Sequence, residues 1–142
     1  MFKKLAIASL LSFTGAVHSI LDYGKVTNSI KSGSPTYEQQ VANKFAIEGA
    51  INAANADKSG DRTILVPAGV RIETFPIDVR DLKDITIEIQ GDIIATSIWE
   101  QWPYGKHGYI NFMQFTDCDG LTFQGKGKID GQGYMWWVRE FL

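Results

Sequence analysis

The sequence predicts a mainly β fold in which short strands stack as the coils of a parallel β-helix, with one capping α-helix. After residue 62, apolar and polar residues alternate in many short runs, and a period of two is typical of strands. Only one segment has helical spacing of its apolar residues. A strand–glycine–strand pattern also repeats, and repeats of about 20 to 50 residues built from short elements indicate a solenoid.

Residues 1–19 are predicted to be a secretory signal peptide. Lys3 and Lys4 form a charged start, and the apolar stretch 5–13 is too short to span a bilayer. Small residues follow as far as Ser19, so we predict cleavage after Ser19. The remaining chain, 20–142, is predicted to be part of one domain that is secreted, with no membrane attachment after signal removal.

The composition narrows the possible partners. The chain has 142 residues, 44% of them hydrophobic, which is enough for a single domain with a buried core. A net charge of −2 without any block of basic residues argues against nucleic acid. No Cys/His cluster suits a metal, and no glycine motif suits a phosphate, so we predict no metal and no cofactor. The lone Cys118 is either a small buried hydrophobe or half of a disulfide whose partner lies outside these residues.

The first elements are a strand at 20–26 and a helix at about 41–56. Apolar residues of the helix fall three and four positions apart, and most of them are alanines. Asn43 is the predicted N-cap. Because alanine lets a helix lie close to a flat surface, we expect this helix to cover the open first end of the solenoid.

The rest of the chain is predicted to form strands, with no second helix. The predicted strands are 63–66, 70–72, 77–79, 85–89, 93–95, 110–115, 121–123 and 128–130. An antiparallel sandwich would also give many short strands. The dipeptides Asp119-Gly120 and Asp130-Gly131, which suit hairpin turns, keep that alternative open.

The repeat favours the solenoid. A shift of 36 residues places Asp81, Ile85, Thr86, Ile87, Gly91 and Ile93 on Asp117, Leu121, Thr122, Phe123, Gly127 and Ile129. A polar and aromatic insertion, 97–108, lies between the two copies. Without the insertion the period is about 24 residues, which is within the range of known solenoids.

The order of these motifs resembles a known family. DYG, AIEGAINAA, TILVPAG, DITIEI and GKIDGQGYMWW follow one another as they do at the start of the polygalacturonases, pectin-degrading enzymes of glycoside hydrolase family 28. The resemblance implies a right-handed parallel β-helix, secretion, a pectin-like polysaccharide substrate and hydrolysis with inversion. A full-length member is expected to be a monomer. The segment SGSPTYEQQVANKF departs from the family, which usually has Gly-Asp-Gly and Asp-Asp there.

The family's catalytic motifs are absent from these 142 residues. The resemblance implies Asn-Thr-Asp, Asp-Asp, Gly-His-Gly and Arg-Ile-Lys after the GKIDGQGYMWW motif, and none occurs. Lys106-His107-Gly108 is interpreted as a loop. Inverting hydrolysis needs an acid and a base on opposite faces of the sugar. We therefore predict an inactive N-terminal fragment without catalytic residues; the alternative is a non-catalytic, secreted β-helix that binds carbohydrate or serves as a structural module.

Four tryptophans and one aspartate are the candidate contacts for the substrate. Aromatic faces stack on sugar rings, and Asp130 lies between a strand and a glycine turn. The alternative is that the indoles cover the flank of the solenoid, because they bury a large area, and that Asp130 supports the turn. The candidates are Trp99, Trp102, Asp130, Trp136 and Trp137.

Overall fold

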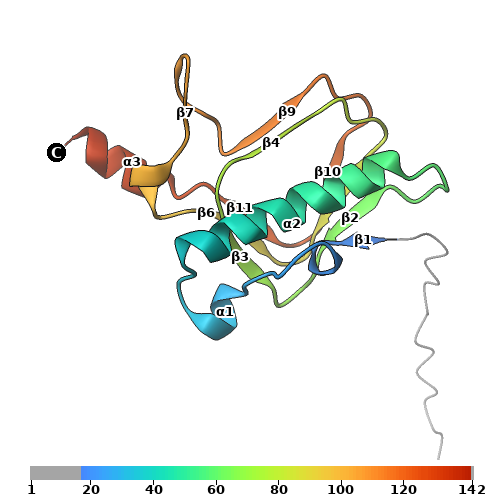
Figure 1. Ribbon diagram of the computed structural model, residues 1–142, viewed down its shortest axis with the longest axis horizontal. Helices are drawn as coiled ribbons and strands as arrows, with labels where there is room; N and C mark the ends of the chain where they lie inside the picture. Colours follow the sequence, from blue (N-terminus) through green and yellow to red (C-terminus); the bar gives the residue numbers. More distant parts are fainter. Residues whose placement is uncertain (1–16, 142) are drawn as a thin grey trace, which may run out of the picture.

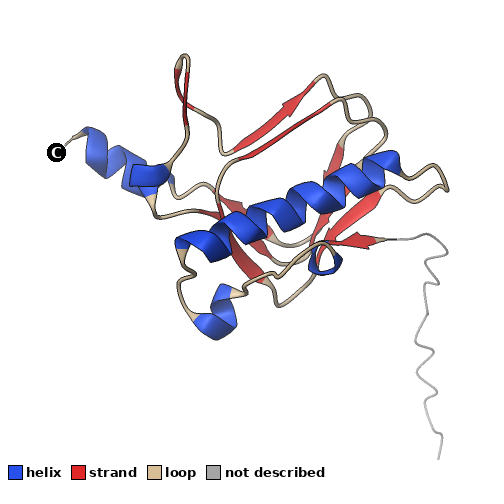
Figure 2. Ribbon diagram, viewed as in Figure 1, coloured by secondary structure: helices blue, strands red, loops and turns tan. Residues whose placement is uncertain are grey.

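The protein was analysed as a computed structural model that describes residues 17–141. It is mainly β, with one long helix, α2 (Tyr37–Ala56), lying along one side of the strands (Figures 1 and 2). Most of the predicted signal peptide, 1–16, lies outside the described residues. None of the helices in the described range is long and apolar enough to cross a membrane.

Apart from one small antiparallel hairpin, β7 (Tyr104–Gly105) and β8 (Gly108–Tyr109), the strands form three parallel sheets. The first has the order β1-β2-β5-β10, the second β11-β6-β3, and the third pairs β4 with β9. The strands of the first sheet are β1 (His18–Ser19), β2 (Thr63–Val66), β5 (Thr86–Ile89) and β10 (Thr122–Gln124). Those of the other two are β3 (Arg71–Thr74), β6 (Asp92–Ala95), β11 (Lys128–Asp130), β4 (Ile77–Arg80) and β9 (Met113–Thr116).

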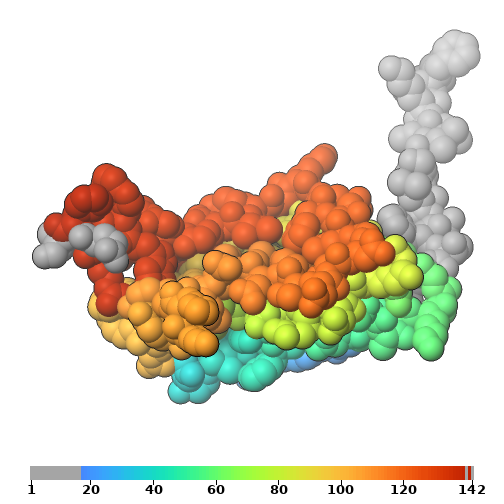
Figure 3. Space-filling model, turned by 90° about the horizontal axis from the view of Figure 1, so that it is seen from above, coloured from blue at the N-terminus to red at the C-terminus, as the bar shows by residue number. Residues whose placement is uncertain are grey.

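From β2 onward the chain visits these sheets in a fixed rotation. It passes through β2, β3 and β4, then through β5, β6 and β9, and then through β10 and β11. Each round therefore lies beside the one before it. Figure 3 shows the result as layers in sequence order, with the α2 side of the molecule opposite the orange and red residues of the last strands.

The strand register confirms the 36-residue repeat. Phe123 pairs with Ile87, Ile129 with Ile93, and Phe115 with Val79. The pairs of the first two rounds give Ile64 beside Ile87 and Ile72 beside Ile93. All strands of the three sheets pair in parallel, so the antiparallel sandwich is wrong for the described residues.

The core consists of stacked rows of isoleucine and valine with α2 packed against them. Side chains that face inward from the first two rounds are almost completely buried, and so are the alanines of α2 that face the strands. Because α2 contacts β1 to β4, it covers the first round of strands, as the alanine spacing predicted. The buried set includes Ala46, Ala50, Ala54, Ile64, Ile72, Ile77, Ile85 and Ile93.

The predicted first strand, 20–26, is wrong. The strand is β1, two residues long, and it pairs with Ile64 and Leu65 of β2. A 3-10 helix, Ile20–Asp22, follows directly. The reason is local: the Ser19 hydroxyl accepts a hydrogen bond from the amide of Leu21, which caps the turn and ends the strand.

The predicted start of the helix is also wrong, because α2 begins at Tyr37 rather than at 41. Its N-cap is Thr36, which forms a capping box with Gln39. Asn43 lies inside the helix and is completely buried. Its side chain donates to the carbonyl of Glu73 and accepts from the amide of Thr27, so it ties the helix to β3 and to the preceding loop.

The prediction of no second helix is wrong as well. A short helix, α1 (Ser29–Ser32), precedes α2, and α3 (Gly133–Glu140) follows β11. Gln132, at φ 50°, is left-handed at the start of α3. Its amide donates to Asp130 and its side chain donates to the carbonyl of Ala95. This turn redirects the chain into a helix too short to show a clear sequence period.

Candidate carbohydrate-contact surface

The insertion 97–108 folds beside α3 and brings together aromatic residues that are distant in sequence. A 3-10 helix, Trp99–Gln101, leads into a small antiparallel hairpin of β7 (Tyr104–Gly105) and β8 (Gly108–Tyr109). In Figure 1 this hairpin projects from the end of the molecule where α3 lies. His107 is in the exposed turn of the hairpin, as the interpretation of Lys106-His107-Gly108 as a loop predicted.

Edge-to-face contacts join the insertion to α3. The ring centroids of Trp136 and Trp102 are 5.0 Å apart, with the planes at 80°. Trp136 and Tyr109 are also 5.0 Å apart, and Tyr104 stacks against Tyr109 at the same distance. Such aromatic pairs contribute more to the stability of a fold than the burial of their surface area alone. We call this group the aromatic cluster; its members are Trp99, Trp102, Tyr104, Tyr109, Phe112 and Trp136.

Arg139 completes the cluster, and sequence reasoning missed it. Its guanidinium carbon lies 4.1 Å from the centroid of the Trp99 ring and 5.6 Å from that of Tyr109. A cation over an indole face is an attractive arrangement. Arg139 lies about one helical turn after Trp136 in α3. This spacing is the one feature of the sequence that could have placed Arg139 on the same helix face as Trp136.

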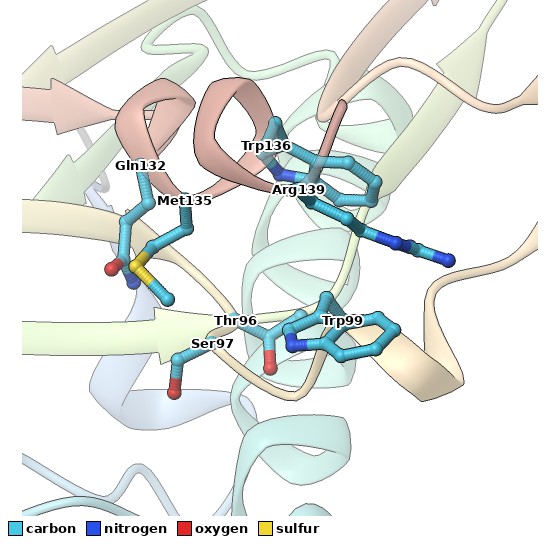
Figure 4. A pocket seen from close by; sticks show the side chains of 7 residues that line it. All are labelled: Thr96, Ser97, Trp99, Gln132, Met135, Trp136 and Arg139. Atoms are coloured by element: carbon cyan, nitrogen blue, oxygen red, sulfur yellow. The ribbon is translucent and has the colours of Figure 1, made fainter. Parts of the chain in front are cut away.

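The pocket beneath Arg139 is too small for a sugar. Figure 4 shows Trp99, Trp136 and Arg139 around it, with Thr96, Ser97, Gln132 and Met135 completing the lining. Its volume is about 10 Å³, which is close to the minimum for one water molecule. A sugar would therefore have to lie across the outside of the cluster.

The four predicted tryptophans differ in their access to solvent. Trp102 is 8% exposed, and its Nε1–H donates to the carbonyl of Ile110 at 2.9 Å. Trp99 and Trp136 are half-buried. Trp137 is 67% exposed and tilts against Phe141, with ring centroids 4.7 Å apart. Among the four, Trp137 therefore presents the most open indole.

Asp130 is held in the turn between β11 and α3. One carboxylate oxygen accepts from the amide of Gln132 at 2.9 Å and the other from Lys128 Nζ at 3.1 Å. The Gln132 amide, followed by Lys128, keeps the pKa of Asp130 below its usual range. A carboxylate bonded in this way stays ionised and stabilises the turn, so it is unsuited to act as a general acid.

The described residues contain no group of three or more His, Cys, Asp or Glu side chains placed to hold a metal ion.

Cys118 is half-buried, and its thiol donates to the carbonyl of Thr116. It packs against the core with Phe112 and Phe115.

Comparisons with known proteins match 58% of the chain to polygalacturonases. One exopolygalacturonase of Zea mays is 36% identical over 84 residues, and a second is 34% identical over 83. A probable polygalacturonase of Arabidopsis thaliana is 33% identical over 85 residues. The matched stretch is polygalacturonase-like.

The polygalacturonase-like stretch corresponds to a small part of these relatives. The chain spans 19% of the length of each Zea mays relative and 18% of the Arabidopsis thaliana protein. No family model matches the chain. No solved structure matches it either.

Proposed function

We propose that this chain forms the N-terminal part of a secreted polygalacturonase-like glycoside hydrolase that cleaves pectin by inverting hydrolysis. The similarity to three polygalacturonases over 58% of the chain carries the proposal. The rotation of the chain through three parallel sheets supports it, because that is the topology of a parallel β-helix. We propose the right-handed form, as the family resemblance implies.

In this proposal the described residues supply the first coils and their cap. Inverting enzymes place two carboxyl groups about 6.5–9.5 Å apart on either side of the scissile bond. Asp130, the one acidic candidate, is engaged by Lys128 and Gln132. The acid and the base would therefore come from further coils of the longer protein, and residues 1–142 alone would not hydrolyse pectin.

The test is the release of reducing sugar from polygalacturonate. We expect none from purified residues 1–142 and measurable release from a longer product of the same gene, if its transcript continues. Turnover by residues 1–142 would contradict the assignment of the catalytic groups to later coils. A longer product that folds but leaves polygalacturonate intact would refute the hydrolase proposal.

A second candidate function is a non-catalytic, secreted module that binds a pectin-like polysaccharide. The exposed Trp137 and Tyr104, at 67% and 73%, favour it. The proposed partner is the polysaccharide, without nucleic acid, membrane or cofactor, and the full-length protein would be monomeric. Affinity electrophoresis in gels containing polygalacturonate should show retardation that Trp137→Ala weakens. Phe45→Ala is the matched control, because Phe45 on α2 is 62% exposed, close to the value for Trp137. Equal migration with and without polymer would exclude binding.

A further inference from the structure

Residues 17–19 belong to the folded domain, although the sequence placed them in a leader. His18 and Ser19 form β1, whose partners in β2 are Ile64 and Leu65. β1 is thus the outermost strand of the first sheet, beside the first round of strands (Figure 1). Without it, the outer backbone groups of β2 would lose their partner.

His18 links β1 to the C-terminal end of α2. Its Nε2 lies 3.3 Å from Asp57 Oδ2, and its Nδ1 lies 2.5 Å from the hydroxyl of Tyr23. The side chains of His18 and Asp57 are only 11% and 16% exposed. Asp57 is also the C-cap of α2 and accepts from the amide and the hydroxyl of Ser59. His18 therefore joins a strand, the following turn and a helix end.

The bond after Ser19 would be a poor place for a new chain end. Ile20 is 0% exposed and belongs to the core cluster. Cleavage there would place a charged α-ammonium group on a core residue, and it would also remove β1, which pairs with β2 beside that residue. The same cut would remove the Ser19 hydroxyl that caps the 3-10 helix.

We propose that processing leaves His18 and Ser19 in the mature chain and that the leader is cut between Ala16 and Val17. The residues one and three positions before that bond are Ala16 and Thr14, which are small enough for a leader cleavage site. The sequence permits either bond. The contacts of β1 distinguish them, because the fold uses the residues that the later cut would discard. The proposal rests on the secretion proposed above.

The first test is the mass of the secreted protein. The full chain, with its own leader, is expressed in a eukaryotic secretory host and the product is analysed by intact mass spectrometry. We expect the mass of residues 17–142. A product that begins at Ile20, or one that keeps the whole leader, overturns the proposal. The result is independent of pectin hydrolysis, so it separates this inference from the proposed enzyme activity.

The second test asks whether the fold needs the retained residues. In the same host, deletion of residues 17–19 joins the leader directly to Ile20. We expect a fall in Tm of about 5 °C or more, or loss of the secreted product. His18→Ala should show part of the same fall. His107→Ala is the matched control and should leave Tm unchanged, because His107 lies in an exposed hairpin turn. Equal Tm and yield for the deletion and the full chain contradict the proposal.

Discussion

At the scale of single residues, Gly91 sets how closely the second round of strands follows the first. A Cβ at this position would fall well inside van der Waals contact with the carbonyl oxygens of Val70 and Pro67. Gly127, its equivalent 36 residues later, is closed in the same way by the carbonyl of Gly91 itself. Each strand–glycine–strand unit therefore needs a glycine because a side chain would collide with the backbone of the preceding strands. The repeat in the sequence reveals the position of this glycine but not the reason for it.

Gly91→Ala should destabilise the protein by about 3 kcal/mol, since backbone atoms must move to admit the methyl group. Chemical denaturation followed by circular dichroism measures the change. Gly131→Ala is the matched control: nothing lies within 4 Å of its added Cβ, so we expect a change within about 0.5 kcal/mol. Equal free energies of unfolding for the two variants would show that the backbone contacts at Gly91 do not exclude a side chain.

Glu73 makes the free energy of unfolding depend on pH, and its contribution to stability decreases as the pH rises. The side chain is 8% exposed in β3, and burial raises its pKa above the ordinary value of 4.5, while Arg71 acts in the opposite direction. A raised folded-state pKa means that protonation favours the folded state. The contribution of Glu73 is therefore fully present below pH 4.5 and is lost as pH rises through the folded-state pKa.

Glu73→Gln should remove the loss of stability that ionisation of Glu73 causes at neutral pH, because glutamine carries no charge. We expect the variant to melt at a higher temperature than the unmodified protein at pH 7 and at nearly the same temperature at pH 3.5. Thermal melts at several pH values measure the difference. Glu100→Gln, on an exposed turn of the insertion, should give no pH-dependent difference. A Tm difference that stays constant from pH 3.5 to pH 7 would contradict the role assigned to burial.

Distant contacts, rather than local sequence, place Asn43 and Arg139. Asn43 looked like a helix cap because asparagine is favoured there, but burial and two distant partners, Thr27 and Glu73, decide its place. The helical spacing from Trp136 to Arg139 does not reveal the partner of Arg139, because its stacking on Trp99 depends on how the insertion folds. Contacts between residues far apart in sequence have no local signal.

At the scale of elements, α3 is attached to the body of the protein mainly through one face. Trp136 contacts Trp102 and Tyr109, while Arg139 covers Trp99. On the outer face, Tyr134 and Trp137 are largely exposed. An isolated helix of eight residues is not stable in water. The contacts of the inner face must therefore hold the helix in place.

Trp136→Ala should release α3, with a loss of about 2 kcal/mol, because a half-buried indole contributes less than a fully buried one. Hydrogen exchange of residues 133–140 should accelerate towards that of an unstructured peptide, while the strands stay protected. Trp137→Ala is the matched control and should leave the exchange of α3 nearly unchanged. Similar protection of α3 in both variants would exclude Trp136 as its anchor.

Elements with a strong local period were predictable, and those set by their neighbours were not. β2, β4 and β5 alternate or run apolar over several residues, and the structure confirms them. β1 was misplaced because a strand of two residues has no period; it exists because β2 offers it an edge. The start of α2 was missed because polar residues fill its first turn, although Thr36 and Gln39 are the signature of a capping box.

At the scale of the whole molecule, the two ends of the stack of strands differ. α2 covers the first round, whereas β9, β10 and β11 each stand last in their sheets within residues 17–141. Phe123 and Ile129 continue the inward-facing rows of Ile87 and Ile93, yet they are 46% and 43% exposed. Unpaired strand edges beside exposed apolar side chains favour association between chains.

The chain 1–142, purified alone, should therefore self-associate through this end. Sedimentation velocity over a range of concentrations should show oligomers, and replacing Phe123 and Ile129 together by lysine should shift the protein towards monomer, since two charges would have to be buried between the stacked ends. Phe45→Lys is the matched control, because Phe45 is exposed on α2, which covers the first round of strands, and it should leave association unchanged. A chain that stays monomeric at every concentration, or oligomers that persist in the double variant, would show that the last strands do not mediate contact between copies.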